Sequence, residues 1–173
     1  MGETPAIPRC IVIFAPHTSN WDFPLLLLLR GGAGRRVSYL AKHTLFRFPF
    51  AWLFRASGAL PVQRSEQHAL VGKLAQAFHE QPELWLAMSP EGTRARTDHW
   101  KSGFYYIALE AQVPVLLAFI DARRRECGLG ALIELTGDVT HDLDRISAFY
   151  RDKQGIVPER ASAIRFLGAD PED

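Results

Sequence analysis

Apolar and polar residues form alternating blocks along this chain, and the blocks predict strands and helices in turn. Uninterrupted apolar runs that are rich in β-branched and aromatic side chains are typical of buried strands. Segments that are wholly or mainly apolar in this way predict strands at residues 10–15, 37–41, 58–64, 84–88, 113–120 and 131–135. Apolar residues at helical spacing, together with capping residues, predict helices at residues 21–30, 65–80, 103–111 and 145–153.

The alternation of strands with helices indicates an α/β protein, since strands separated by helices usually pair in parallel. We expect residues 1–173 to form a single domain with a largely parallel central sheet flanked by helices, and residues 168–173 to be a flexible polar tail. Pro61 interrupts the run at 58–64, so this segment is either an edge strand or the entrance to a strand.

Two further segments are unusually apolar for a surface. Five consecutive leucines at 25–29 give apolar side chains all round the predicted helix, which indicates a buried or interface-facing helix. Residues 42–55 mix aromatic side chains with cations. This mixture favours a packed short helix whose arginines reach water, because aromatic stripes usually belong to cores. The alternative is a surface that dips into lipid with its cations at the headgroups.

Composition narrows the class of protein. With 173 residues, 47% hydrophobic and 23% charged, the chain is long enough to bury a core without disulfides or metals. The net charge of +1 gives no support for a nucleic-acid partner. Only Cys10 and Cys127 occur, which favours a reducing setting although it leaves one bridge open. No apolar run is long enough to span a bilayer and no signal-peptide pattern begins the chain. We therefore expect a cytoplasmic protein, either soluble or peripheral on the cytoplasmic face of a membrane.

A histidine and an aspartate follow the first predicted strand. His17 and Asp22 lie five positions apart, so they cannot be neighbours on one regular helical face. Ser19 and Asn20 are good N-cap residues, which places Asp22 in a first helical turn where the macrodipole favours a carboxylate. We expect Asp22 to fold back toward the His17 ring. A carboxylate on one imidazole nitrogen leaves the other nitrogen free to take a proton from a hydroxyl, as a general base does. The alternative is an ordinary capped helix preceded by a loop histidine.

Polar residues also follow two other predicted strands. Arg64 ends the run at 58–64, and Glu91 to Arg94 follow the strand at 84–88. In a parallel sheet these segments and His17 emerge at the same edge, where α/β proteins place their ligands. The sequence therefore predicts one cleft that contains a base, its carboxylate partner and several cations.

The residue types in this cleft suit a phosphate-bearing ligand. Arg64, Arg94 and Lys101 supply donors for phosphate, and arginine can bind two oxygens at once. Glu91 could hold an arginine or contact a hydroxyl, and Gly92 permits a tight turn or a close approach of substrate. The alternative for each cation is a solvated surface residue. A serine hydrolase is not indicated because no G-x-S-x-G occurs, and the six histidines lack metal-ligand spacing, so we assign no metal.

Four blocks of this sequence resemble a known family. His17-x4-Asp22 is similar to an H-x4-D motif, residues 58–64 to a second block ending in arginine, and Glu91-Gly92-Thr93-Arg94 to an E-G-T-R block. Residues 113–115 are similar to a final block that contains proline, and residues 101–103 to a K-x-G segment. In this order the blocks resemble the glycerolipid acyltransferases of the lysophosphatidic acid (1-acylglycerol-3-phosphate) acyltransferase type. Pro16 and Ser89 depart from the residues frequent in that family, which would affect pocket shape and acceptor choice.

The resemblance implies an O-acyltransferase of phospholipid biosynthesis. It would move a fatty acyl group from an acyl-CoA or acyl-carrier-protein thioester, as co-substrate, to a hydroxyl of a lysophospholipid or glycerol phosphate, with no bound cofactor. His17 would be the general base, Asp22 its partner, and Arg64, Glu91, Gly92, Thr93, Arg94 and Lys101 would bind the acceptor. The implied partners include an acyl carrier protein and a membrane surface that the protein contacts peripherally. Two alternatives stay open: a noncatalytic lipid- or carrier-binding domain, and a thioesterase that uses water as the acceptor.

Overall fold

The structure is a computed structural model that describes residues 4–32, 34–46, 51–62 and 67–167. Its centre is a six-stranded sheet in the order β3-β2-β4-β1-β5-β6. The strands are β1 (Arg9–Ala15), β2 (Val37–Lys42), β3 (Ala59–Val62), β4 (Leu84–Met88), β5 (Val115–Asp121) and β6 (Glu126–Ile133). All neighbouring pairs are parallel except β5 with β6. The predicted α/β class with a largely parallel sheet is confirmed.

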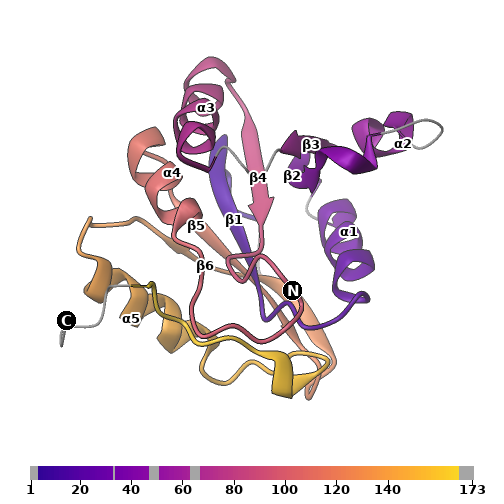
Figure 1. Ribbon diagram of the computed structural model, residues 1–173, viewed down its shortest axis with the longest axis vertical. Coiled ribbons are helices and arrows are strands. Elements are labelled where there is room, and N and C mark those ends of the chain that lie inside the picture. Colours follow the sequence, from indigo (N-terminus) through magenta and orange to yellow (C-terminus); the bar gives the residue numbers. More distant parts are fainter. Residues whose placement is uncertain (1–3, 33, 47–50, 63–66, 168–173) are drawn as a thin grey trace.

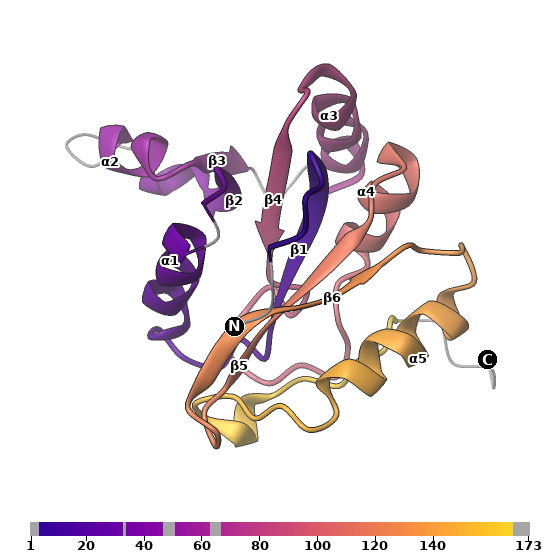
Figure 2. The ribbon, with the colours of Figure 1, turned by 180° about the vertical axis from the view of Figure 1, so that it is seen from behind.

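Helices cover both faces of this sheet (Figures 1 and 2). They are α1 (Asp22–Gly32), α2 (Ala51–Ala56), α3 (Gln67–Glu80), α4 (Gly103–Ala111) and α5 (Val139–Tyr150), with short 3-10 turns η1 (His43–Leu45) and η2 (Pro158–Arg160). Helices α3, α4 and α5 pack on one core cluster, whereas Leu25 and Leu26 of α1 and Phe54 of α2 pack on the other. Side chains of β1 alternate between the two clusters, as the two-residue repeat of a strand requires: Ile11 and Ile13 face one, Val12 and Phe14 the other.

Most predicted elements lie within two residues of their observed ends, and α4 has the predicted bounds. The interrupted run that contains Pro61 forms β3, which is one of the two edge strands of the sheet. The first residues of the predicted helix at 65–80, like the polar tail at 168–173, lie outside the described part of the chain. In the segment at 42–55, the Phe46 and Phe54 rings pack together with centroids 5.9 Å apart, while the Trp52 side chain is exposed.

Two predicted elements have wrong bounds. The last strand begins at Glu126 rather than 131, because residues 122–125 make a tight turn that pairs β6 with β5. Asp121 accepts hydrogen bonds from the backbone N–H groups of Arg123 and Arg124 and so stabilises that turn. The last helix is α5 at 139–150 rather than 145–153, because the Asp138 side chain caps it by accepting from the His141 N–H at 3.0 Å.

No helix within the described residues has both the length and the apolar character that a membrane span requires.

Candidate active site

His17 and Asp22 lie together in the loop between β1 and α1, which we call the first loop (residues 16–22). His17 Nδ1 is 3.1 Å from Asp22 Oδ2. Nδ1 is buried and makes no well-aligned hydrogen bond with the described residues, so the pair is in contact without ideal geometry. Histidine–carboxylate contacts of this kind are often long or poorly aligned in structures without a ligand. The His17 side chain is 21% exposed, and its nitrogen that is buried without a hydrogen-bond partner among the described residues is Nδ1, not Nε2.

The Asp22 carboxylate is fixed by the backbone of the same loop. Its Oδ2 accepts hydrogen bonds from the Thr18 N–H at 2.7 Å and the Ser19 N–H at 2.8 Å, and the residue has no exposed surface. The Ser19 carbonyl accepts from the Asp22 N–H, and the Ser19 hydroxyl accepts from the Trp21 N–H, so the chain turns into α1 at this point. These bonds hold a buried carboxylate in one orientation, toward the imidazole.

Glu91 links the first loop to the loop after β4, which we call the second loop (residues 89–101). Its Oε1 accepts a hydrogen bond from the His17 backbone N–H at 3.1 Å, and the residue is 2% exposed. Burial raises the pKa of the Glu91 carboxyl to about 7, against the opposing effect of the His17 N–H, and the Asp22 carboxylate adds to the increase. Glu91 Oε2 is buried without a hydrogen-bond partner among the described residues. The contact that the structure gives Glu91 is therefore with the backbone of the first loop, at His17.

Gly92 makes the turn of the second loop. Its φ is +65°, a conformation that side chains disfavour, and its N–H donates to the Ser89 carbonyl at 3.1 Å. A Cβ at this position would lie 2.9 Å from Lys101 Cε and 3.2 Å from Lys101 Nζ. The absence of a side chain at residue 92 thus lets the Lys101 ammonium lie against the turn. The Lys101 N–H also donates to the Pro90 carbonyl at 2.8 Å, which closes the second loop.

Exposed polar groups follow this turn. Thr93, Arg94 and Arg96 are exposed. Neither arginine forms an ion pair with the described residues. The structure therefore brings Glu91, Gly92, Thr93, Arg94 and Lys101 into one loop that touches the loop of His17 and Asp22. Arg64 lies outside the described residues, so its predicted place in the cleft stays a prediction.

A third segment, which sequence reasoning missed, supports both loops. Residues 154–166, here called the C-terminal segment, run along the carboxyl edge of the sheet (Figure 1). Thr18 is fully buried, and its Oγ1 accepts a hydrogen bond from the Val157 N–H at 3.1 Å. A Cβ on Gly155 would lie 2.6 Å from that Oγ1, so the segment fits closely against the first loop. The Thr18 hydroxyl, which lies between His17 and Asp22 in the sequence, therefore holds the C-terminal segment against the first loop.

The same segment contacts the second loop. The Trp100 N–H donates to the Arg165 carbonyl at 2.8 Å, and the Thr97 N–H donates to Ser162 Oγ at 3.0 Å. Just before the segment, the Tyr150 hydroxyl lies 2.9 Å from the Ala118 carbonyl and 3.2 Å from the Ile13 carbonyl, to which it donates. Burial raises the pKa of Tyr150 well above its ordinary value, with the Glu91 charge as a second cause, so the phenol stays a neutral donor. No sequence motif marks these contacts, because each depends on backbone groups.

Within the described residues, no group of three or more histidines, cysteines or acids is gathered as metal ligands would be.

A comparison with protein-family models gives one match, to the family described as Acyltransferase, over residues 3–120. Searches of curated proteins and of solved structures found no match. The matched range contains both loops of the site, and the C-terminal segment lies beyond it.

Proposed function

The chain belongs to the acyltransferase family, and we propose that it moves a fatty acyl group from an acyl-CoA or acyl-carrier-protein thioester to a hydroxyl of a lysophospholipid or glycerol phosphate. The contact of His17 Nδ1 with a wholly buried Asp22 carboxylate carries this proposal, because it leaves the other face of an imidazole available beside a loop of cations. A phosphate-bearing acceptor fits exposed Arg94 and the Lys101 ammonium.

In the proposed reaction, His17 Nε2 accepts the proton of the acceptor hydroxyl while Asp22 stabilises the imidazolium that forms. The hydroxyl oxygen attacks the thioester carbonyl carbon, the new C–O bond forms, and the C–S bond breaks. The departing thiolate needs little help, since thiol pKa values lie near about 8.5, and it can take the proton back from the imidazolium. No acyl-enzyme is needed, and no step requires a metal or bound cofactor.

The second loop would act by binding and orienting the acceptor. Arg94 and Lys101 would hold the phosphate, and Arg64, which lies outside the described residues, is expected to join them. Glu91 would keep the His17 backbone in place and so fix the distance between the base and the bound hydroxyl. Positioning of this kind lowers the barrier because the reacting atoms meet without further loss of freedom.

The test is a thiol-release assay of the purified protein with acyl-CoA and acyl carrier protein donors across lysophosphatidic acid, neutral lysolipids and glycerol phosphate, with mass spectrometry of the products. An acylated phosphate-bearing acceptor is the expected product. Release of free fatty acid at the same rate with and without acceptor would instead identify a thioesterase. Lipid binding without any thiol release would identify a noncatalytic domain. Either result overturns the proposal.

A further inference from the structure

A cation of the C-terminal segment lies beside the first loop. Arg160 ends the 3-10 turn η2, and its Nη1 donates to the Thr18 carbonyl at 3.5 Å. Thr18 follows His17 directly in the chain, and residues 16–22 include no lysine or arginine. Arg160 therefore brings a positive charge to a loop in which the Asp22 carboxylate is buried.

The chain on either side of Arg160 is fixed to one of the two loops. Before it, the Val157 N–H donates to Thr18 Oγ1 in the first loop at 3.1 Å. After it, Ser162 Oγ accepts a hydrogen bond from the Thr97 N–H in the second loop at 3.0 Å. Within the turn, the Arg160 N–H donates to the Val157 carbonyl at 3.0 Å. Arg160 thus belongs to the short stretch of chain that passes from the first loop to the second.

The Arg160 guanidinium keeps most of its bonding capacity for a ligand. The side chain is exposed and forms no ion pair with the described residues. Its contact with the Thr18 carbonyl is at the outer limit of a hydrogen bond, and a guanidinium carries several N–H donors. The planar fork of these donors fits two oxygens of a phosphate at once. Arg160 can therefore bind a phosphate without breaking an ion pair in the part of the chain that the structure describes.

The proposed reaction brings two phosphate-bearing molecules to this place. A CoA or carrier-protein thioester has phosphate on the donor side, and a lysophospholipid or glycerol phosphate has it on the acceptor side. Both must reach His17 together, and two anions that share one set of cations repel each other. Arg94 and Lys101 supply positive charge from the second loop. Arg160 supplies it at the first loop, so that each anion can have a cation of its own.

We propose that Arg160 binds a phosphate group of a substrate beside His17. The proposal rests on the proposed function, because the phosphate belongs to the thioester donor or to the hydroxyl acceptor of that reaction. Arg160 orients the bound molecule and takes no part in proton transfer. The family match covers residues 3–120, so this contact comes from chain beyond the matched range.

The experiment measures binding of single ligands to the full chain by calorimetry, so that no reaction occurs. CoA and glycerol 3-phosphate are the ligands with phosphate, and pantetheine is the ligand without it. Arg160→Gln removes the charge and keeps a side-chain N–H donor, so it should weaken binding of CoA or of glycerol 3-phosphate by about tenfold. A loss with CoA identifies the donor phosphate, and a loss with glycerol 3-phosphate identifies the acceptor phosphate. Arg160→Lys keeps the charge and should weaken the same ligand by about threefold or less.

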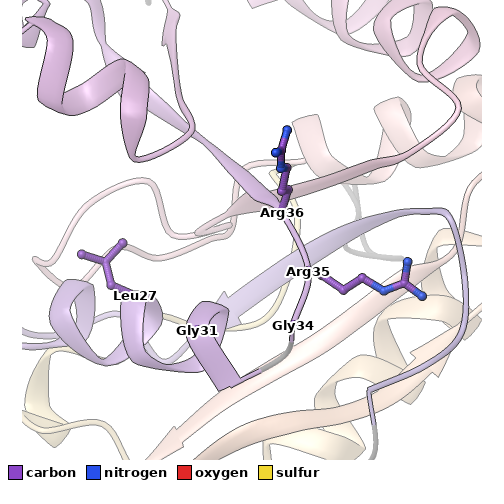
Figure 3. Close-up of a pocket in the computed structure, with 5 residues that line it drawn as sticks. All are labelled: Leu27, Gly31, Gly34, Arg35 and Arg36. Carbon is purple, nitrogen blue, oxygen red and sulfur yellow. The ribbon is translucent and has the colours of Figure 1, made fainter.

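The matched control is Arg36→Gln, which removes an exposed arginine from the opposite edge of the sheet. Arg36 directly precedes β2, whereas the first loop follows β1, and both strands run in the same direction. An open pocket beside this arginine is lined by Leu27, Gly31, Gly34, Arg35 and Arg36 (Figure 3). Arg36→Gln should bind all three ligands as the wild type does. Thermal unfolding checks the fold of every variant.

Unchanged affinity of Arg160→Gln for both CoA and glycerol 3-phosphate overturns the proposal. So does an equal loss for CoA and pantetheine, which would mean that Arg160 only holds the first loop in place. Acyl transfer is measured separately. Unchanged affinities in Arg160→Gln together with acyl transfer by the wild type contradict this proposal and leave the proposed function standing. A wild type that neither binds these ligands nor transfers an acyl group contradicts both.

Discussion

The two loops of the site follow neighbouring parallel strands, yet the polar side chains of the first loop are mostly buried and those of the second loop are mostly exposed. In the first loop Thr18 and Asp22 have no exposed surface, and their side chains bond to backbone. In the second loop Glu91 is buried, whereas Arg94 and Arg96 point to solvent without ion pairs to the described residues. A buried, internally bonded loop keeps one geometry, as proton transfer requires. An exposed loop of cations keeps its bonding capacity for a ligand.

Replacing His17, the proposed base, should produce the largest effect. His17→Ala is expected to lower thiol release by about 10³-fold, because no group remains to accept the hydroxyl proton. Asp22→Asn should lower it by about 10²-fold, since the amide keeps the volume and loses the charge that stabilises the imidazolium. Both are measured with saturating acyl-CoA and acceptor, and thermal unfolding checks the fold. Undiminished transfer by His17→Ala would remove His17 from the mechanism. The proposed division between a first loop for proton transfer and a second loop for ligand binding would then fail.

The buried end of the second loop should respond to pH. Because the pKa of Glu91 is raised to about 7, the folded protein keeps a proton there that the unfolded chain releases from about pH 4.5 upward. The free energy of unfolding therefore falls as pH rises through this window. Glu91→Gln cannot ionise and can still accept from the His17 N–H, so we expect it to be about 2 kcal/mol more stable than wild type at pH 8 and equal at pH 4. Urea unfolding at both pH values measures this, and a difference that does not change with pH would contradict it.

The exposed end of the second loop should act on the acceptor alone. Arg94→Ala is expected to raise KM for phosphate-bearing acceptors by about tenfold, the effect of losing one charged hydrogen bond, and to leave KM for neutral acceptors near its wild-type value. Arg123→Ala, which removes an exposed arginine from the β5–β6 turn, is the matched control. An equal rise in KM for both acceptor classes would mean that Arg94 does not bind the phosphate.

The anchor of the first loop should give the smallest effect. Thr18→Val keeps the shape of the side chain and removes the oxygen that accepts from the Val157 N–H. We expect kcat to fall about fivefold with little change in KM, because a buried donor is left unpaired and the base is held less firmly. Thr18→Ser restores the oxygen and should restore most of kcat. If Thr18→Ser is as impaired as Thr18→Val, the hydrogen bond to the C-terminal segment does not position the loop.

Interactions between residues close in sequence allowed the first strand, the first loop and helix α1 to be predicted. Apolar runs and caps, which act over a few residues, predicted the first strand, the loop after it and a helix at 21–30, and the observed helix begins one residue later, at Asp22. The fold back of Asp22 toward His17 likewise involves groups within five positions. The start of β6 was not predicted because Gly128 and Gly130 interrupt its apolar pattern. Backbone pairing with β5 makes these residues part of the strand despite that interruption.

Tertiary structure alone decided how these local pieces are held together. Glu91 reaches the His17 backbone across 74 positions, and Val157 reaches Thr18 across 139. Both contacts use backbone N–H groups, which every residue but proline possesses, so no side-chain pattern can signal them. By itself the sequence determined which residue types stand at the edge of the sheet. The pairing of β4 with β1, and the return of the C-terminal segment to the same edge of the sheet, decided that Glu91 and Val157 hold the loop that contains His17.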